Sequence, residues 1–583
     1  MFRVHQVGKN LNEQGTVEKG TVEGNPVDRT STNAEPKVEP DPIVKPIEIP
    51  TATAEEILIK KMQTEIQIAT ETAQYYKKQL EQMKKDANKQ KEIEEKGYNL
   101  SYDNLMETIK DFPKADGLSY VLHNMLLREV DEDAVKANEL MQRHWDVTCG
   151  VKAPSNQMYS GRCWMFAGLN ILVRQLINGY KLEPTFELSQ SYLFFWHYYE
   201  QYNDILNLFF FKPELQDQWN IERADILQEP LHDGANWINF YRLVKKYGVV
   251  PKPMYPESMS TVHSEEMKVI LANMLAKDLC DMEKQKLKIS VGVNDNKAQK
   301  ESFVKFRNIK IKAVLKVLCE FMGKPPLNGQ IKLKTVANNL AISDPNHKKT
   351  SKIEVESPAK FFAAINNMGG AVIVDGQPLL LQPIDVDNLV QIINDKRVDD
   401  RKYDNDKLKL SQNAHWYTTE YQEHQTHRNL LYNLKDMKII SKIVLLSLKM
   451  YRPVWFACNM NTDVDKRRQG MDNKLFRPDL FTNFQLDMDK ATRMKYGRAH
   501  CNHAMLIVGA ETGENGEVIA FNVENSWGRE GPSGGFYKMT IGWFNERAYT
   551  WVVHRKIIEK VLDTKIGEAP ENIGIFSHID FFG

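Results

Sequence analysis

The stretch NQMYSGRCWMFAG, residues 156–168, places a cysteine where an apolar, helix-forming run begins. The run continues as CWMFAGLNILVRQLI, which predicts a helix that starts at Cys163. A thiol attacks a carbonyl only as the thiolate, and the positive end of a helix dipole favours that anion. Cys163 is therefore a candidate nucleophile, provided that a base from elsewhere in the chain lies beside it. An inert, buried thiol is the alternative for a single cysteine in this position.

A candidate base and its partner lie far along the chain. Among the 14 histidines, His503 opens the apolar strand HAMLIVGA (503–510), which would hold its ring rigidly. Asn525, in the next strand-like run, can accept a hydrogen bond from one ring nitrogen, and Trp527 can cover that bond from water. Gln157 stands six residues before Cys163, so its side-chain amide can join the Cys163 backbone N–H in an oxyanion hole. Each of these features alone is weak evidence for a catalytic site, but the four together, in the order Gln, Cys, His and Asn, are specific evidence.

These motifs resemble the papain-like cysteine peptidases, through NQMYSGRCWMFAG, NHAMLIVGA and VENSWG. Papain relatives place the histidine about 130–150 residues beyond the cysteine, whereas His503 lies 340 residues beyond Cys163, which indicates a large insertion. Further stretches narrow the resemblance, over residues 110 to 560, to the bleomycin hydrolase and aminopeptidase C group. They are FELSQSYLFFW (186–196), KKYGVVPKPMYPES (245–258), VLCEFMGKPPL (317–327) and PVWFACNM (453–460).

The resemblance implies an α+β fold, with a papain-like core of a helical lobe and an antiparallel β lobe. It implies Cys163 as nucleophile, His503 as base and later acid, Asn525 as orienter and Gln157 as oxyanion donor. It also implies an intracellular aminopeptidase that acts on peptides without metal or cofactor and assembles as a homohexamer. In such barrel-shaped hexamers, a C-terminal arm lies in each active-site cleft and restricts cleavage to amino-terminal residues.

Two departures from the group concern substrate binding. DGANW (233–237) is similar to the group's D-G-G-x-W strand, which makes Asp233, Gly234 and Ala235, together with Trp527, substrate-binding candidates. The methyl group of Ala235 could narrow the cleft, or it could fit with a small shift. The C-terminus GIFSHIDFFG differs from the group's usual alanine-ended tail, so the amino-terminal specificity is less secure than the thiol chemistry.

Composition and periodicity divide the chain into six segments. From residue 120 to 250 helical signals dominate. Strand patterns follow from residue 452, in PVWFACNM (453–460), HAMLIVGA (503–510), VIAFNVENSW (518–527) and GGFYKMTIGWF (534–544). The predicted segments are a disordered Pro-rich tail (1–50), a heptad helix (51–97), a helical lobe with Cys163 (98–257), a mostly helical insertion (258–445), a β lobe with His503 and Asn525 (446–560) and a C-terminal arm (561–583).

The extension before the core suggests a second kind of function. Apolar residues from Ile59 to Ala87 recur at alternating spacings of three and four, which is typical either of a coiled coil or of an amphipathic helix on its own protein. Residues 1–97 could therefore bind a protein partner. The alternative to an enzyme is a scaffold protein of a large assembly, for example a cytoskeletal one, built on a peptidase fold.

Bulk properties exclude several other classes. Lysine plus arginine equals aspartate plus glutamate at 77 each, so no global charge favours nucleic acid or an anionic membrane. No apolar run approaches a membrane span, and no secretory leader is expected at the start. The six cysteines are scattered without C-x₂-C spacing, which argues against disulfides and structural zinc and favours a cytoplasmic location. HCNH (500–503) has a metal-like pattern but no further ligand cluster nearby.

Overall fold

The structure is a computed structural model that describes residues 133–150, 152–180, 182–217, 219–288, 296–326, 331–333, 353–374, 377–396, 410–412, 430–476 and 488–563, with scattered positions between 63 and 110. The chain forms two compact units, Met1–Lys114 and Ala115–Gly583. The described positions of the first unit are helical. Of the predicted heptad seam only Ile66 is described, and it is 63% exposed. The tail 1–50, the rest of the seam and the arm from residue 564 lie outside the described residues.

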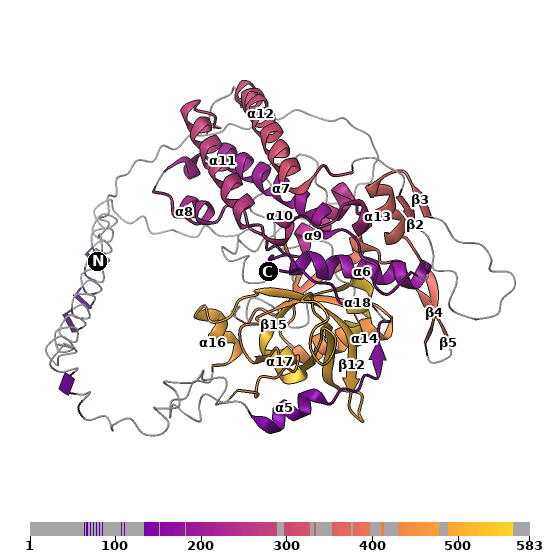
Figure 1. The fold of residues 1–583 in the computed structure, drawn as a ribbon. Helices are drawn as coiled ribbons and strands as arrows, with labels where there is room; N and C mark the ends of the chain where they lie inside the picture. Colours follow the sequence, from indigo (N-terminus) through magenta and orange to yellow (C-terminus); the bar gives the residue numbers. More distant parts are fainter. Residues whose placement is uncertain are drawn as a thin grey trace, which may run out of the picture. The chain divides into compact units, whose positions relative to one another are not determined.

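Long helices form one part of the second unit, as the sequence predicts (Figure 1). The helix α7 begins where the Ser189 side chain accepts the Tyr192 N–H, and α9 begins where Asn236 accepts the Asn239 N–H. The helices here are α6 (Cys163–Tyr180), α7 (Gln190–Phe211), α8 (Ile221–Gln228), α9 (Trp237–Tyr247), α10 (Met259–Val262), α11 (Glu265–Lys284), α12 (Asn296–Met322) and α13 (Pro358–Asn366), with 3-10 turns at Pro213–Gln216, Lys252–Met254 and Val386–Asn388.

An eleven-stranded sheet forms the other part, in the order β10-β11-β14-β13-β12-β9-β15-β6-β8-β7, with β1 beside β12. Neighbours are antiparallel except β11 with β14 and β6 with β8. The four strands expected from residue 452 onward are confirmed as β9 (Val454–Cys458), β12 (His503–Thr512), β13 (Val518–Glu524) and β14 (Phe536–Thr540). The others are β1 (Val147–Thr148), β6 (Leu389–Ile393), β7 (Leu410–Gln412), β8 (Leu430–Asn433), β10 (Val464–Asp465), β11 (Gly470–Met471) and β15 (Ala548–His554).

The structure differs from the sequence analysis in two details of these strands. The segment 258–445 carries helices α10 to α13, but it also extends the main sheet, because the apolar strand β6 pairs with the edge of β15. Two separate hairpins lie in the same segment, β2 (Ile331–Leu333) with β3 (Ile353–Val355) and β4 (Gly370–Val374) with β5 (Gln377–Leu381). The run 534–544 leaves the sheet after Thr540, whose side chain accepts the Trp543 N–H and starts α17 (Ile541–Arg547).

Both faces of the central strands are buried, which explains their nearly continuous apolar sequences. Along β9 and β12, Trp455 and Leu506 face the core around α6, while the alternate residues Phe456 and Met505 face a second core. The remaining helices with described bounds are α5 (Ala134–Met141), α14 (Met437–Lys449), α16 (Lys490–Lys495) and α18 (Arg555–Leu562). Of these, α14 and α18 pack on the second core together with α17. The sheet is thus a rigid layer between α6 and these helices.

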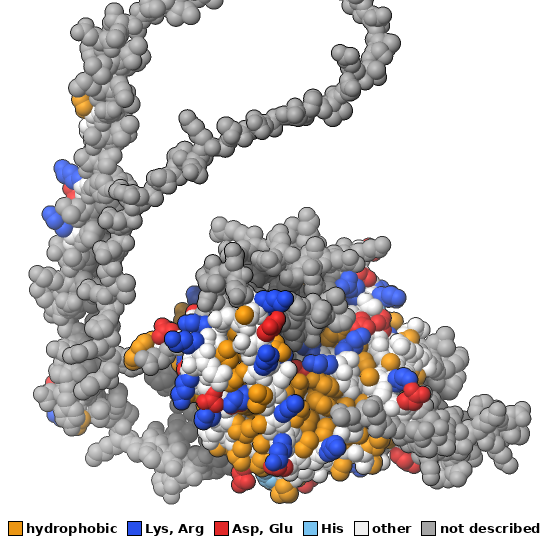
Figure 2. Space-filling model, turned by 90° about the horizontal axis from the view of Figure 1, so that it is seen from above, with side chains coloured by type: hydrophobic (Ala, Val, Ile, Leu, Met, Phe, Trp, Pro, Cys, Tyr) orange, Lys and Arg blue, Asp and Glu red, His pale blue; other side chains and the backbone are white. Residues whose placement is uncertain are grey.

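The surface carries both signs of charge. On the face seen in Figure 2, lysine and arginine side chains are scattered among aspartate and glutamate over the described residues. None of the described helices combines the length and hydrophobicity of a membrane span. Within the same residues, no group of three histidine, cysteine or carboxylate side chains is placed to hold a metal ion.

Candidate active site

Cys163 is the first residue of α6, as the sequence predicts. Its Sγ atom lies at the positive end of an 18-residue helix and accepts a hydrogen bond of 3.3 Å from the backbone N–H of Ala504. Ala504 is the second residue of β12 and follows His503 directly. The thiol is therefore seated against the beginning of the strand that carries the candidate base, although the two residues are 340 positions apart.

His503 and Asn525 come together across adjacent strands. His503 begins β12 and Asn525 directly follows β13, and the two strands are antiparallel neighbours. His503 Nε2 and Asn525 Oδ1 are 2.8 Å apart and form a hydrogen bond. Nδ1 is the ring nitrogen that this bond does not use. The Trp527 ring lies 4.8 Å from the His503 ring, centre to centre, so it shields this bond as expected. All three side chains are held by the ends of a rigid sheet.

Gln157 lies beside this pair, but its side chain is already hydrogen-bonded. Its Nε2 donates to the Ser160 carbonyl at 2.6 Å, and its backbone N–H donates to the Ser526 carbonyl at 2.8 Å. A primary amide carries two hydrogens, so one Nε2 hydrogen remains for a further acceptor. The structure thus places Gln157 in the loop that leads to Cys163, with its donor partly engaged.

Ser526 joins the two halves of the site, and the sequence analysis did not single it out. Its hydroxyl donates to Gln157 Oε1 at 2.5 Å, and its backbone N–H donates to Asn525 Oδ1 at 2.7 Å. One residue therefore contacts both the candidate oxyanion donor and the partner of His503. Its position between Asn525 and Trp527 was the only signal in the sequence.

A buried ion cluster also escaped the sequence analysis. Glu524, the last residue of β13, accepts hydrogen bonds from Lys152 at 3.1 Å, Asn170 at 2.8 Å and Arg174 at 2.5 Å. The side chains of Lys152 and Glu524 are fully buried, and that of Arg174 is 4% exposed. Burial would raise the pKa of Glu524, but the charges of Lys152 and Arg174 hold it below the usual value. The cluster ties α6 to the strand end next to Asn525.

The segment expected to be a substrate strand is a loop in the structure, and Trp237 already begins α9 because the Asn236 side chain caps that helix. The Asp233 carboxylate is buried and accepts hydrogen bonds from the Gly161 N–H at 3.0 Å and from the hydroxyls of Tyr198 and Ser264. A side chain added at Gly234 would meet no atom within 4 Å. Ala235 is half-buried and packs against the helical core.

Comparison with known proteins shows the family of the chain. Residues 99–578 match the Peptidase C1-like family. The chain belongs to the Peptidase C1-like family. Aminopeptidase C of Lactococcus lactis is 29% identical over 77% of this chain and 91% of its own length, and human bleomycin hydrolase is 29% identical over 70% and 82%. The fold is similar to that of PepW from Lactobacillus rhamnosis (TM-score 0.63, 22% identity), with 80% of this chain and 96% of the other covered.

The candidate nucleophile and the candidate base are both buried. Burial raises the pKa of Cys163 to about 11, against the hydrogen bond from the Ala504 N–H. Burial also lowers the pKa of His503 to about 4, although its bond to Asn525 acts in the opposite direction. Each charge formed alone is therefore disfavoured in this buried site.

Formation of both charges together is less unfavourable. Proton transfer from the thiol to the imidazole leaves the site neutral overall, and opposite charges formed close together attract each other more strongly in a buried site than in water. The helix dipole of α6 adds to the stabilisation of the anion. Among the described residues, the hydrogen bond to the sulfur comes from the Ala504 N–H, directly after His503, so His503 is the candidate base for the thiol proton.

Proposed function

We propose that this family member is a cysteine aminopeptidase that removes amino-terminal residues from peptides through a thioester intermediate. The observation that carries the proposal is the contact of Cys163 Sγ with the first residues of β12, where His503 is bonded to Asn525. The names of the relatives, aminopeptidase C and bleomycin hydrolase, support the amino-terminal specificity.

In the first half of the proposed reaction, His503 Nδ1 takes the thiol proton while Sγ bonds to the substrate carbonyl carbon. The negative charge that develops on the carbonyl oxygen is stabilised by the Cys163 N–H and the remaining Nε2 hydrogen of Gln157. The C–N bond then breaks, and His503 returns its proton to the departing amine. Asn525 keeps the ring in position during both transfers.

In the second half, water hydrolyses the thioester. His503 takes a proton from the attacking water, the C–S bond breaks, and the proton returns to Cys163. The acid product carries the former amino-terminal residue. No step requires a group beyond these side chains and water.

Substrate contacts are proposed for residues 233–237. Gly234 leaves room for an extended peptide to approach the backbone, as the open space around it supports. Asp233 contributes by holding Gly161, two residues before Cys163. Trp527 borders the opposite side of the site next to His503.

Assembly and location are proposed on the family resemblance. We expect a homohexamer in which the arm 561–583 limits cleavage to amino termini, and a protein partner for residues 1–97. A cytoplasmic location is supported by six cysteines that are all unpaired. No feature of the described residues favours the scaffold alternative over the peptidase.

The test uses purified full-length chain with aminoacyl coumarin amides. Cys163→Ala is expected to abolish turnover with an unchanged melting temperature, whereas Cys319→Ala, a half-buried cysteine on α12, keeps wild-type activity. Turnover by Cys163→Ala would refute the proposed nucleophile. Equally fast cleavage of the N-acetylated substrates would instead refute the amino-terminal specificity.

A further inference from the structure

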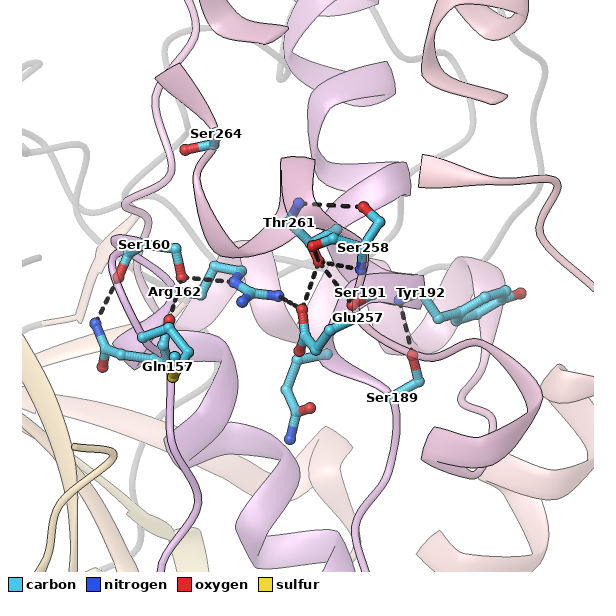
Figure 3. Close-up of polar contacts among 12 residues, drawn as sticks. Gln157, Ser160, Arg162, Ser189, Ser191, Tyr192, Glu257, Ser258, Thr261 and Ser264 are labelled. Carbon is cyan, nitrogen blue, oxygen red and sulfur yellow. Dashed lines mark hydrogen bonds and ion pairs between the residues drawn. The ribbon is translucent and has the colours of Figure 1, made fainter. Parts of the chain in front are cut away.

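A buried ion pair lies directly beside the candidate nucleophile. Arg162 precedes Cys163 and has no exposed surface. Its Nη1 bonds to Glu257 Oε2 at 2.9 Å, and its Nε bonds to Ser160 Oγ at 2.7 Å (Figure 3). The reaction steps above do not use this charge.

The pair reaches Gln157 through Ser160. The Ser160 hydroxyl accepts from Arg162 Nε and donates to the Gln157 carbonyl at 2.7 Å. The Ser160 carbonyl in turn accepts from Gln157 Nε2 at 2.6 Å. Arg162 thereby directs the Ser160 hydroxyl proton toward the Gln157 carbonyl. These hydrogen bonds hold the loop from Gln157 to Arg162 in a closed ring that includes the Gln157 side chain, the candidate oxyanion donor.

The other end of the pair is anchored outside the loop. Thr261 Oγ1 donates to Glu257 Oε2 at 2.5 Å, and Thr261 is itself held by a capping box with Ser258 at the start of α10 (Figure 3). Burial would raise the pKa of Glu257, but the charge of Arg162 and the Thr261 bond hold it below the usual value. The carboxylate is therefore a fixed anion to which the loop is attached.

The geometry of the Arg162–Glu257 ion pair is not that of a pair that serves only to stabilise the fold. Arg162 Nη2 is buried without a hydrogen-bond partner among the described residues, and buried ion pairs often stabilise a fold no better than apolar residues would. The guanidinium is nevertheless confined between two rings, 5.3 Å from the Phe166 centroid and 5.0 Å from that of Phe194. Confinement of this kind fixes orientation.

We propose that Arg162, held by Glu257, is a positioning residue for the oxyanion hole: through Ser160 it sets the place of the Gln157 amide. This inference rests on the proposed function, because it assigns Gln157 to the developing oxyanion. A merely structural ion pair is the competing explanation.

The test separates oxyanion stabilisation from thiol reactivity. Arg162→Lys keeps the charge, but its ammonium lacks the planar fork that bonds Ser160 and Glu257 together. Ser160→Ala removes only the hydroxyl link. We expect both to lower kcat for a coumarin amide by about 10-fold or more, up to the roughly 100-fold loss typical of a missing oxyanion donor in Gln157→Ala. The KM and the rate of Cys163 alkylation by iodoacetamide, which needs no oxyanion hole, are expected to change less than twofold.

Double variants decide between positioning and structure. If Arg162 acts through Gln157, each change combined with Gln157→Ala costs little more kcat than Gln157→Ala alone. Independent, multiplicative losses, or alkylation that falls in step with kcat, would overturn the inference. Arg223→Lys is the control, because its pair with Glu283 is remote in the helical part, and its kcat should be unchanged. If Arg162→Lys does not fold, comparison of Ser160→Ala, Gln157→Ala and their double variant gives the same decision.

Failure of the inference and of the proposed function are distinguishable. An active Cys163→Ala variant would refute the function itself. An inactive Cys163→Ala variant together with wild-type kcat in Arg162→Lys and Ser160→Ala would refute only the positioning role.

Discussion

Glu524→Gln should destabilise the second unit strongly, because it leaves two buried cations without their anion. Glu524 is contacted by Lys152 and Arg174, and all three side chains are at most 4% exposed. Removal of one partner from a buried pair typically costs about 3–5 kcal/mol. At an unfolding entropy of about 2.1 cal/mol/K per residue, the roughly 470 residues of Ala115–Gly583 have about 1 kcal/mol/K. The melting temperature should therefore fall by about 3–5 °C.

The assay is thermal unfolding followed by circular dichroism at one scan rate. The matched control is Glu139→Gln, which breaks the exposed pair with Lys136 at 55% exposure and should cost less than about 0.5 kcal/mol. Lys152→Met added to Glu524→Gln should recover part of the loss, because one unpaired charge disappears. Equal shifts for Glu524→Gln and Glu139→Gln would refute the reasoning that this cluster is a buried, mutually dependent set.

Two further predictions concern the backbone and pH. Gly248 has φ +74°, and an added Cβ would lie 2.1 Å from the Pro358 backbone. Gly248→Ala should therefore lower the melting temperature far more than Gly497→Ala, because Gly497 has a similar φ of +66° but open surroundings. Equal shifts would show that the close approach of Gly248 to Pro358 is unimportant. Iodoacetamide alkylation of Cys163 should be nearly independent of pH between about 6 and 8 in the wild type, because the thiol proton is held by His503. In His503→Ala the rate should rise about tenfold per pH unit over this range, since burial alone raises the thiol pKa to about 11; parallel profiles would contradict the pairing.

Local patterns predicted the parts of the site that depend on short segments. Three short segments each have a recognisable sequence pattern: the helix start at Cys163, the strand that begins at His503, and residues Asn525–Trp527. The structure brings these segments together. Apolar runs also located the central strands, because both faces of those strands are buried.

Contacts between distant polar residues could not be predicted in the same way. Glu524 and Lys152 are 372 positions apart, and no periodicity distinguishes a buried charge from an exposed one. Arg174 offered a signal, because it interrupts the apolar helix run ILVRQLI and a buried cation there requires a partner. Strand β6 was missed because five residues within a charged segment carry little pattern of their own.

The central claim is that Cys163 alone among six cysteines is made reactive, by His503. The most direct measurement is labelling of the native chain at pH 7 with an epoxide inhibitor of thiol peptidases, followed by mass spectrometry of every cysteine peptide. The account predicts one label per chain on Cys163, none on the other five, and loss of the label in His503→Ala. Labelling spread over several cysteines, or an unaffected label in His503→Ala, would contradict it.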